Sequence, residues 1–263
     1  MPSRRGIWIY RAVIFLLANM AALTARAETF VTDLPLAEGG MQRLLYTAPP
    51  NPRAAVLMLP GGNGMVEIGP DGGIGRLGAN FLLRTSPTWQ AQGFAVAVVT
   101  PPNGMSLLGY RHTPAYAAQL GEVVDFIHTR TSAPVWLVGT SQGAIAAVSG
   151  GARLGGKIAG IVVSSSVTGR SNSGETLFDS DPGSVTVPAL VVANTGDTCQ
   201  ASPPGEAPRI AAAFARSPRK DIIYVQSTAS QGPACEAMSP HGYFGIEAET
   251  VSRITAWIAG GQR

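Results

Sequence analysis

The fold of this chain is decided by the stretch Val135-Trp136-Leu137-Val138-Gly139-Thr140-Ser141-Gln142-Gly143-Ala144-Ile145-Ala146-Ala147-Val148. It joins an apolar run, a Gly-x-Ser-x-Gly turn and a run of small, helix-compatible residues. Strand, sharp turn and helix form the context in which this motif carries chemistry. The turn holds its central residue in a strained conformation, and the flanking glycines keep Cβ atoms out of the bend. Ser141 is therefore predicted to lie above the sheet edge, at the positive end of the following helix.

Apolar strands and helical segments alternate on both sides of this turn. Strands are predicted at 41–46, 55–59, 94–99, 135–138, 158–164, 187–194 and 221–226. Helices are predicted near 78–93 with a break at Pro87, and at 114–130, 144–148, 206–216 and 246–259. Fully apolar strands are typical of a parallel sheet that is buried on both faces. The alternation predicts an α/β fold, a doubly wound, mostly parallel sheet with helices on both faces.

The first 27 residues have the pattern of a signal peptide. Arg4, Arg5 and Arg11 precede an apolar run at 12–23, and Ala25-Arg26-Ala27 has the small residues of a cleavage site. The run of roughly 12 residues is shorter than the ~20 that span a bilayer; an uncleaved anchor is the alternative. We expect a secreted or periplasmic protein, one domain over 28–263 and no stable membrane insertion after leader removal.

The charge of the remaining chain is close to neutral. Four of the 19 Lys and Arg residues lie in 1–27, which leaves 15 against 16 Asp and Glu residues, a formal net charge of −1. The basic pI near 9.1 therefore comes mostly from the leader. Nothing in this balance indicates nucleic acid as a partner.

A nucleophilic serine needs an adjacent base, usually histidine, and an acid that orients that base. The histidines are His112, His128 and His241. His241 follows the last predicted strand, on the sheet edge where doubly wound folds bind ligands, and is the predicted base; His112 is the alternative. Asp197, just after the strand at 187–194, is the predicted acid, with Asp179 and Asp181 as alternatives.

The cysteines support this assignment. Cys199 lies two residues after Asp197, and Cys235 lies six residues before His241. A leader implies an oxidising compartment, so a disulfide is expected; two free buried thiols are the alternative. The bridge would tie the two catalytic loops together, since it requires Cα atoms within about 7 Å.

Backbone N–H groups must stabilise the oxyanion of the reaction. One is predicted at Gln142, the residue after the nucleophile. The second is predicted at Gly62 or Asn63, in the Gly-rich loop that follows the strand at 55–59. An ordinary Gly-rich turn is the alternative for this loop.

No cofactor or metal is expected. Residues 73–78 spell Gly-x-Gly-x-x-Gly, but no strand directly precedes them, and no acid for a ribose hydroxyl closes the next strand. The chain contains no Cys-x-x-Cys or His-Glu-x-x-His spacing.

The chain resembles the α/β-hydrolase superfamily over roughly residues 54–260. The resemblance rests on the Gly-Thr-Ser141-Gln-Gly turn, the Leu59-Pro60-Gly61-Gly62 loop and the order Ser141, Asp197, His241. The polar segment 165–186 is too short for a large cap domain, and in this respect the chain is similar to small esterases and dienelactone-hydrolase-like proteins. Dienelactone hydrolases differ in using a cysteine nucleophile. The resemblance implies a serine hydrolase that acts on a small-molecule carboxylic ester or thioester. A peptidase or amidase with the same triad, or a catalytically silent binding protein on this scaffold, are the alternatives.

Overall fold

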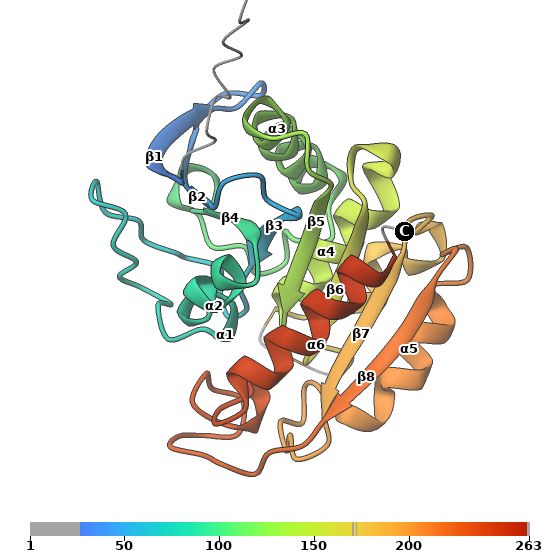
Figure 1. Cartoon of the computed structure of the whole chain (residues 1–263). Coiled ribbons are helices and arrows are strands. Elements are labelled where there is room, and N and C mark those ends of the chain that lie inside the picture. Colours follow the sequence, from blue (N-terminus) through green and yellow to red (C-terminus); the bar gives the residue numbers. More distant parts are fainter. Residues whose placement is uncertain (1–26, 170, 172, 262–263) are drawn as a thin grey trace, which may run out of the picture.

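Eight strands form one sheet in the computed structural model, which describes residues 27–169, 171 and 173–261 (Figure 1). The predicted signal peptide, apart from Ala27, lies outside the described residues. The strands are β1 (Glu28–Pro35), β2 (Met41–Ala48), β3 (Ala54–Leu59), β4 (Phe94–Val99), β5 (Val135–Thr140), β6 (Gly160–Ser164), β7 (Ala189–Asn194) and β8 (Lys220–Val225). Their spatial order is β1-β2-β4-β3-β5-β6-β7-β8.

The six strands from β3 to β8 are mutually parallel, as predicted, and β1 and β2 form an antiparallel extension at one edge. Every residue of β3, β4, β5, β6 and β7 is buried. This agrees with their continuous apolar sequences, because helices cover both faces of a parallel sheet. The antiparallel strand β1 had no counterpart in the sequence prediction.

The helices lie in two layers, one on each face of the sheet (Figure 1). They are α1 (Phe81–Arg84), α2 (Ser86–Ala91), α3 (Pro114–Arg130), α4 (Gly143–Arg153), α5 (Ala207–Ala213) and α6 (Glu247–Gly260). Helices α3, α4 and α5 contribute to the hydrophobic cluster on one face, and α1, α2 and α6 contribute to the cluster on the other.

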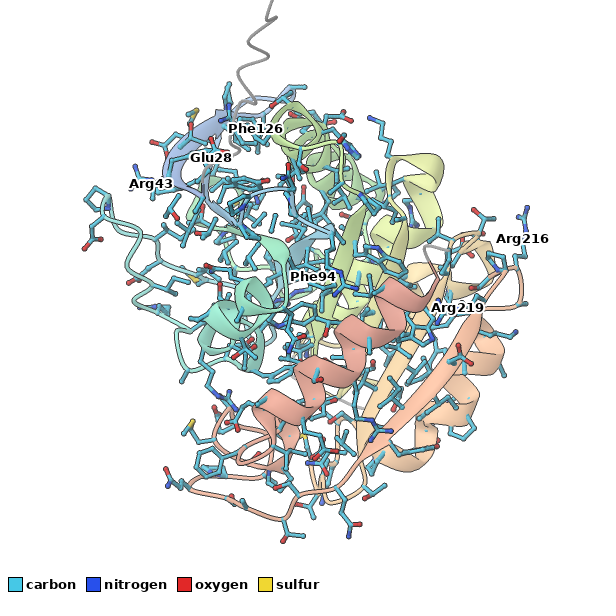
Figure 2. The ribbon with its side chains drawn as sticks, in the orientation of Figure 1. Glu28, Arg43, Phe94, Phe126, Arg216 and Arg219 are labelled. Carbon is cyan, nitrogen blue, oxygen red and sulfur yellow. A yellow bond between two sulfur atoms is a disulfide. The ribbon has the colours of Figure 1, made fainter. Side chains whose placement is uncertain are left out.

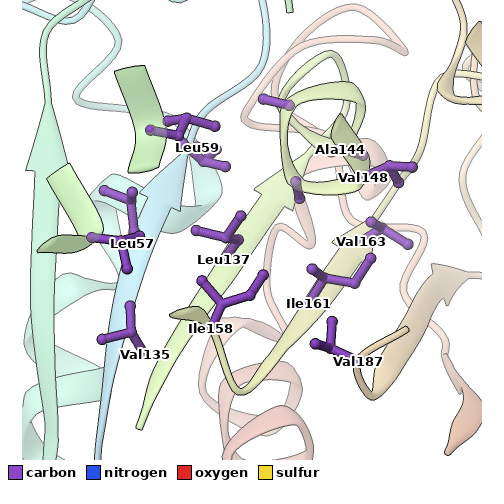
Figure 3. Close-up of a cluster of buried hydrophobic side chains, with 14 of the residues drawn as sticks. Leu57, Leu59, Val135, Leu137, Ala144, Val148, Ile158, Ile161, Val163 and Val187 are labelled. Carbon is purple, nitrogen blue, oxygen red and sulfur yellow. The ribbon is translucent and has the colours of Figure 1, made fainter. Parts of the chain in front are cut away.

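Side chains of each strand alternate between these two clusters, since successive residues point to opposite faces. Leu57 and Leu137 belong to the cluster that contains α4, whereas Val56 and Val138 belong to the cluster that contains α6. Figure 3 shows Leu57, Leu137 and neighbouring strand side chains close to the start of α4. The elbow helix is thus held by core packing directly below the site.

Charged side chains lie at both edges of the sheet. Figure 2 labels Glu28 and Arg43 on the β1–β2 edge, and Arg216 and Arg219 beside the start of β8. In the described part of the chain, no helix has both the length and the apolar composition required to cross a bilayer.

Three helices differ from the prediction. Helix α4 continues to Arg153, five residues beyond the predicted end at 148. The segment at 78–93 is two short helices separated at Thr85, two residues before the predicted break at Pro87. Helix α5 ends at Ala213 rather than near 216, because the backbone of the buried Phe214 leaves the helical region with a ψ of 55°. Within segment 165–186, the described residues form the short 3-10 helices η3 (Leu177–Ser180) and η4 (Pro182–Ser184) and no longer helix or strand.

Candidate active site

Ser141 occupies a strained turn between β5 and α4. Its φ is 55°, in the left-handed region that non-glycine residues rarely adopt. A Cβ at Gly143 would overlap the carbonyl oxygen of Leu59, and a Cβ at Gly139 would overlap Gly143. The Ser141 N–H donates to the Ser164 carbonyl over 2.9 Å, which holds the turn against β6. The two motif glycines are therefore required by close backbone approach, and the turn places Ser141 at the N-terminal end of α4.

His241 lies in the 3-10 helix η6 (Pro240–Gly242), in the loop between β8 and α6. Hydrogen bonds from two strand-end side chains anchor this loop: Asn194 Nδ2 donates to Pro240 O (2.8 Å) and Ser165 Oγ donates to His241 O (2.8 Å). The buried Tyr243 hydroxyl donates to Val192 O over 3.0 Å. Burial raises the pKa of the Tyr243 phenol, so this anchor stays protonated.

Asp197 follows β7 and contacts His241. Its Oδ2 lies 2.9 Å from His241 Nδ1, and its Oδ1 accepts the Cys199 N–H over 2.8 Å. Both side chains are buried. With Nδ1 bound to the carboxylate, Nε2 is the ring nitrogen that can accept a proton from a serine.

Ser202 is a polar neighbour of this pair that the sequence analysis did not include. Its hydroxyl lies 2.9 Å from His241 Nδ1 and 3.3 Å from Asp197 Oδ2, and the residue is 3% exposed. The only sequence signal was its position in the loop that carries Asp197 and Cys199. The structure thus surrounds His241 Nδ1 with a carboxylate and a hydroxyl.

Ser141 and His241 line the same cavity of about 220 Å³. Leu77, Phe81 and Ala237 supply apolar lining. Within the described residues, no hydrogen bond of 3.5 Å or less joins Ser141 Oγ to His241. Such contacts are often long before substrate binds and tighten in the reacting complex.

The loop after β3 approaches Ser141 closely. A Cβ at Gly61 would lie 2.8 Å from Ser141 Cβ, and both Gly61 and Gly62 line the cavity. In the described part of the chain, the N–H groups of Gln142 and Gly62 donate to no backbone carbonyl. Asn63 is not among the residues that line the cavity, and its carbonyl accepts the Leu107 N–H over 2.9 Å. Of the two predicted positions, Gly62 lines the cavity and Asn63 does not.

The alternative residues have other partners. His112 Nδ1 lies 2.7 Å from Glu175 Oε2, and Asp179 Oδ2 accepts the Thr176 N–H over 2.7 Å in a capping box. His112 does not line the cavity that contains Ser141. Among the described residues, Asp197 is the carboxylate that hydrogen-bonds to His241, and neither Asp179 nor Asp181 does so. Across the described residues, no three His, Cys, Asp or Glu side chains converge as ligands for a metal ion.

The structure joins Cys199 and Cys235 in the expected disulfide, with their Cα atoms 4.8 Å apart. Cys199 is buried beside Asp197, and Cys235 lines the cavity. The bridge therefore connects the Asp197 loop to the segment that leads into His241.

Replacing both cysteines by serine is expected to lower the free energy of unfolding by about 3–4 kcal/mol, as loop-closure entropy gives for a bridge of this span. The span is 36 residues in sequence. Denaturant unfolding of the double variant and the oxidised wild type measures the difference. Alkylation of unfolded, non-reduced wild type should modify neither cysteine, and modification of both would contradict the bridge.

Comparison with known proteins finds similarity in structure but not in sequence. No family model matches the chain, and no curated protein matches it. An esterase from Pyrococcus furiosus superimposes with a TM-score of 0.64 at 11% identity, covering 88% of this chain and 91% of that one. A dienelactone hydrolase from Anabaena variabilis superimposes with a TM-score of 0.59 at 12% identity, covering 89% of this chain and 96% of that one. A lidless α/β serine hydrolase from Xanthomonas campestris superimposes with a TM-score of 0.57 at 13% identity, covering 86% of this chain and 95% of that one. At these identities the similarity concerns the fold.

Proposed function

We propose that this chain, which has the α/β-hydrolase fold, is a serine hydrolase that cleaves carboxylic ester or thioester bonds. One observation carries the proposal. His241, which the buried Asp197 contacts over 2.9 Å, lines the same cavity as Ser141 at its strained turn. A structural turn would require neither a buried carboxylate–imidazole pair nor a cavity beside it.

In the proposed reaction, His241 Nε2 removes the proton from Ser141 Oγ, which attacks the carbonyl carbon of the substrate. Asp197 holds the imidazole through Nδ1 and stabilises the imidazolium that forms. The N–H groups of Gln142 and Gly62 donate to the developing oxyanion. His241 then protonates the leaving alcohol or thiol, and the acyl group remains on Ser141.

Water completes the cycle by the same steps. His241 takes a proton from the water as it attacks the acyl-enzyme, and the tetrahedral intermediate again lies against the two N–H groups. His241 returns the proton to Ser141 Oγ, which leaves the carbonyl carbon and releases the acid. No cofactor enters this scheme.

The cavity favours small esters without negative charge. Its lining contains Glu236 but no Lys or Arg, and its largest side chains include Leu77 and Phe81. A volume of about 220 Å³ suits short acyl or alcohol groups, because drug-sized ligands occupy sites of about 300–1,000 Å³. Esterases among the proteins of similar fold point in the same direction. An amide would place a poorer leaving group in the same site.

We also infer that the protein acts outside the cytoplasm, in the periplasm or the medium. The leader pattern at 1–27 supports this location. The Cys199–Cys235 bridge does so as well, because disulfides persist in oxidising compartments.

A chain-length series of p-nitrophenyl esters on the mature protein tests the function. We expect the highest kcat/KM on short acyl chains and a decline as the chain outgrows the cavity. A fluorophosphonate probe is expected to label the folded protein at Ser141, as peptide mass spectrometry can locate. Absence of both labelling and turnover would instead support a silent binding protein on this scaffold.

A further inference from the structure

Arg111 is a buried cation behind the proposed oxyanion loop. The residue is 1% exposed, and its Nη2 lies 3.2 Å from the Pro60 carbonyl oxygen and 3.5 Å from that of Gly61. Its Nη1 is also buried and has no hydrogen-bond partner within the described residues. Buried guanidinium groups are uncommon unless paired, so this position requires an explanation.

The surrounding loop leaves space for the Arg111 side chain. Gly64 has a φ of 74°, and a Cβ there would lie 2.8 Å from Arg111 Nη2. The Leu107 N–H donates to Asn63 O, which attaches the segment before Arg111 to the loop. Arg111 is thus held directly under the turn that contains Gly61 and Gly62.

Of the two carbonyls that Arg111 contacts, that of Gly61, at 3.5 Å, belongs to the peptide group that carries the Gly62 N–H, and that of Pro60, at 3.2 Å, belongs to the preceding peptide, which carries the Gly61 N–H. A cation at the oxygen of a peptide fixes its orientation and polarises it, which strengthens the N–H as a donor. We propose that Arg111 is a positioning residue for the oxyanion hole, which orients and polarises the Gly61–Gly62 peptide toward the cavity. This inference rests on the proposed serine-hydrolase function.

Arg111 does not act as a substrate-binding cation, because it is absent from the cavity lining. Its charge is influenced by the carboxylate of Glu175, whose side chain is 4% exposed and contacts His112 and the Gly109 N–H. Burial lowers the pKa of Arg111 while the negative charge of Glu175 raises it. The ordinary pKa of arginine is above about 12, so the guanidinium remains charged in neutral solution.

Two substitutions separate this role from a packing role. Arg111→Met keeps similar length and apolar bulk but removes the charge and the hydrogen bonds to the Pro60 and Gly61 carbonyls. Arg111→Lys retains the charge but not the planar fork. Removing an oxyanion donor outright lowers kcat by about 10²–10³-fold. Arg111→Met weakens the donor without removing it, so we expect kcat to fall roughly 10- to 100-fold.

The two roles are distinguished by comparing substrate binding with transition-state binding in Arg111→Met. We expect its KM for a short p-nitrophenyl ester to change by less than about threefold. An arylboronic acid mimics the tetrahedral adduct, and we expect its affinity to fall by about the same factor as kcat. Arg111→Lys is expected to lie between Arg111→Met and wild type. Arg219→Met, which removes a partly buried cation beside the start of β8, serves as the control and should retain wild-type kcat.

Wild-type kcat and boronate affinity in folded Arg111→Met would overturn the inference while leaving the proposed function intact. If Arg111→Met fails to fold, Arg111→Lys decides the matter. Wild-type kcat and wild-type boronate affinity in that variant, despite the altered fork, would overturn the peptide-orienting role. Wild-type protein without Ser141-dependent turnover would overturn both proposals.

Discussion

Replacing Ser141 by alanine is expected to lower kcat on a short activated ester by about 10⁵- to 10⁶-fold, to the level left by the oxyanion donors and binding alone. The substitution removes the only atom that forms the covalent acyl-enzyme. Alanine meets the same backbone strain as serine at a φ of 55°, so the fold is expected to persist. Stopped and continuous assays of p-nitrophenyl acetate hydrolysis, corrected for the spontaneous rate, measure the effect.

Ser132→Ala provides the matched control for Ser141→Ala. Ser132 is exposed and precedes β5 at the end of the strand remote from the elbow. It should retain wild-type kcat and fluorophosphonate labelling. Ser141→Ala protein that still hydrolyses the ester at a hundredth of the wild-type rate or more would show that another group is the nucleophile.

Changing Asp197 to asparagine is expected to lower kcat by about 10⁴-fold. The amide keeps the shape of the carboxylate, but it removes the negative charge 2.9 Å from His241 Nδ1. An asparagine NH2 group facing Nδ1 would favour the tautomer with its proton on Nε2, which cannot accept the serine proton. Steady-state kinetics on the same ester, with circular dichroism to verify folding, test this expectation.

Two further variants calibrate the Asp197→Asn result. Asp179→Asn alters an exposed carboxylate that caps η3 and should leave kcat unchanged. Ser202→Ala removes the hydroxyl that contacts both His241 Nδ1 and Asp197 Oδ2. A loss of about 1.5 kcal/mol of transition-state stabilisation corresponds to a fall of about tenfold in kcat. Asp197→Asn that loses less activity than Ser202→Ala would assign the acid role elsewhere.

The sequence predicted the parallel part of the sheet because its signals are local. Each strand from β3 to β7 is a short apolar run closed by turn residues, and burial on both faces imposes that composition wherever the strand pairs. Strand β1 was missed for the opposite reason. Its sequence Glu28–Pro35 alternates weakly, and it is an edge strand that exists through its pairing with β2.

Some residues of the candidate site could likewise be predicted from local sequence. Ser141 was found from its neighbours, because the turn itself requires the glycines at 139 and 143. Asp197 and His241 could be placed from chain order, because loops at the carboxyl ends of parallel strands meet at one sheet edge. Whether these predicted residues carry out the reaction is decided by the experiments above.

Only the tertiary structure showed that Ser202 joins the Asp197–His241 pair and that Arg111 lies under the Gly61–Gly62 peptide. Neither residue belongs to a motif, and their contacts join loops 39 and 50 residues apart in sequence. Local sequence determined the strands, the elbow and the order of the polar residues, because steric and burial constraints act on neighbours along the chain. The choice of partner for a buried hydroxyl or guanidinium is made by the packing of distant loops, which no local pattern encodes.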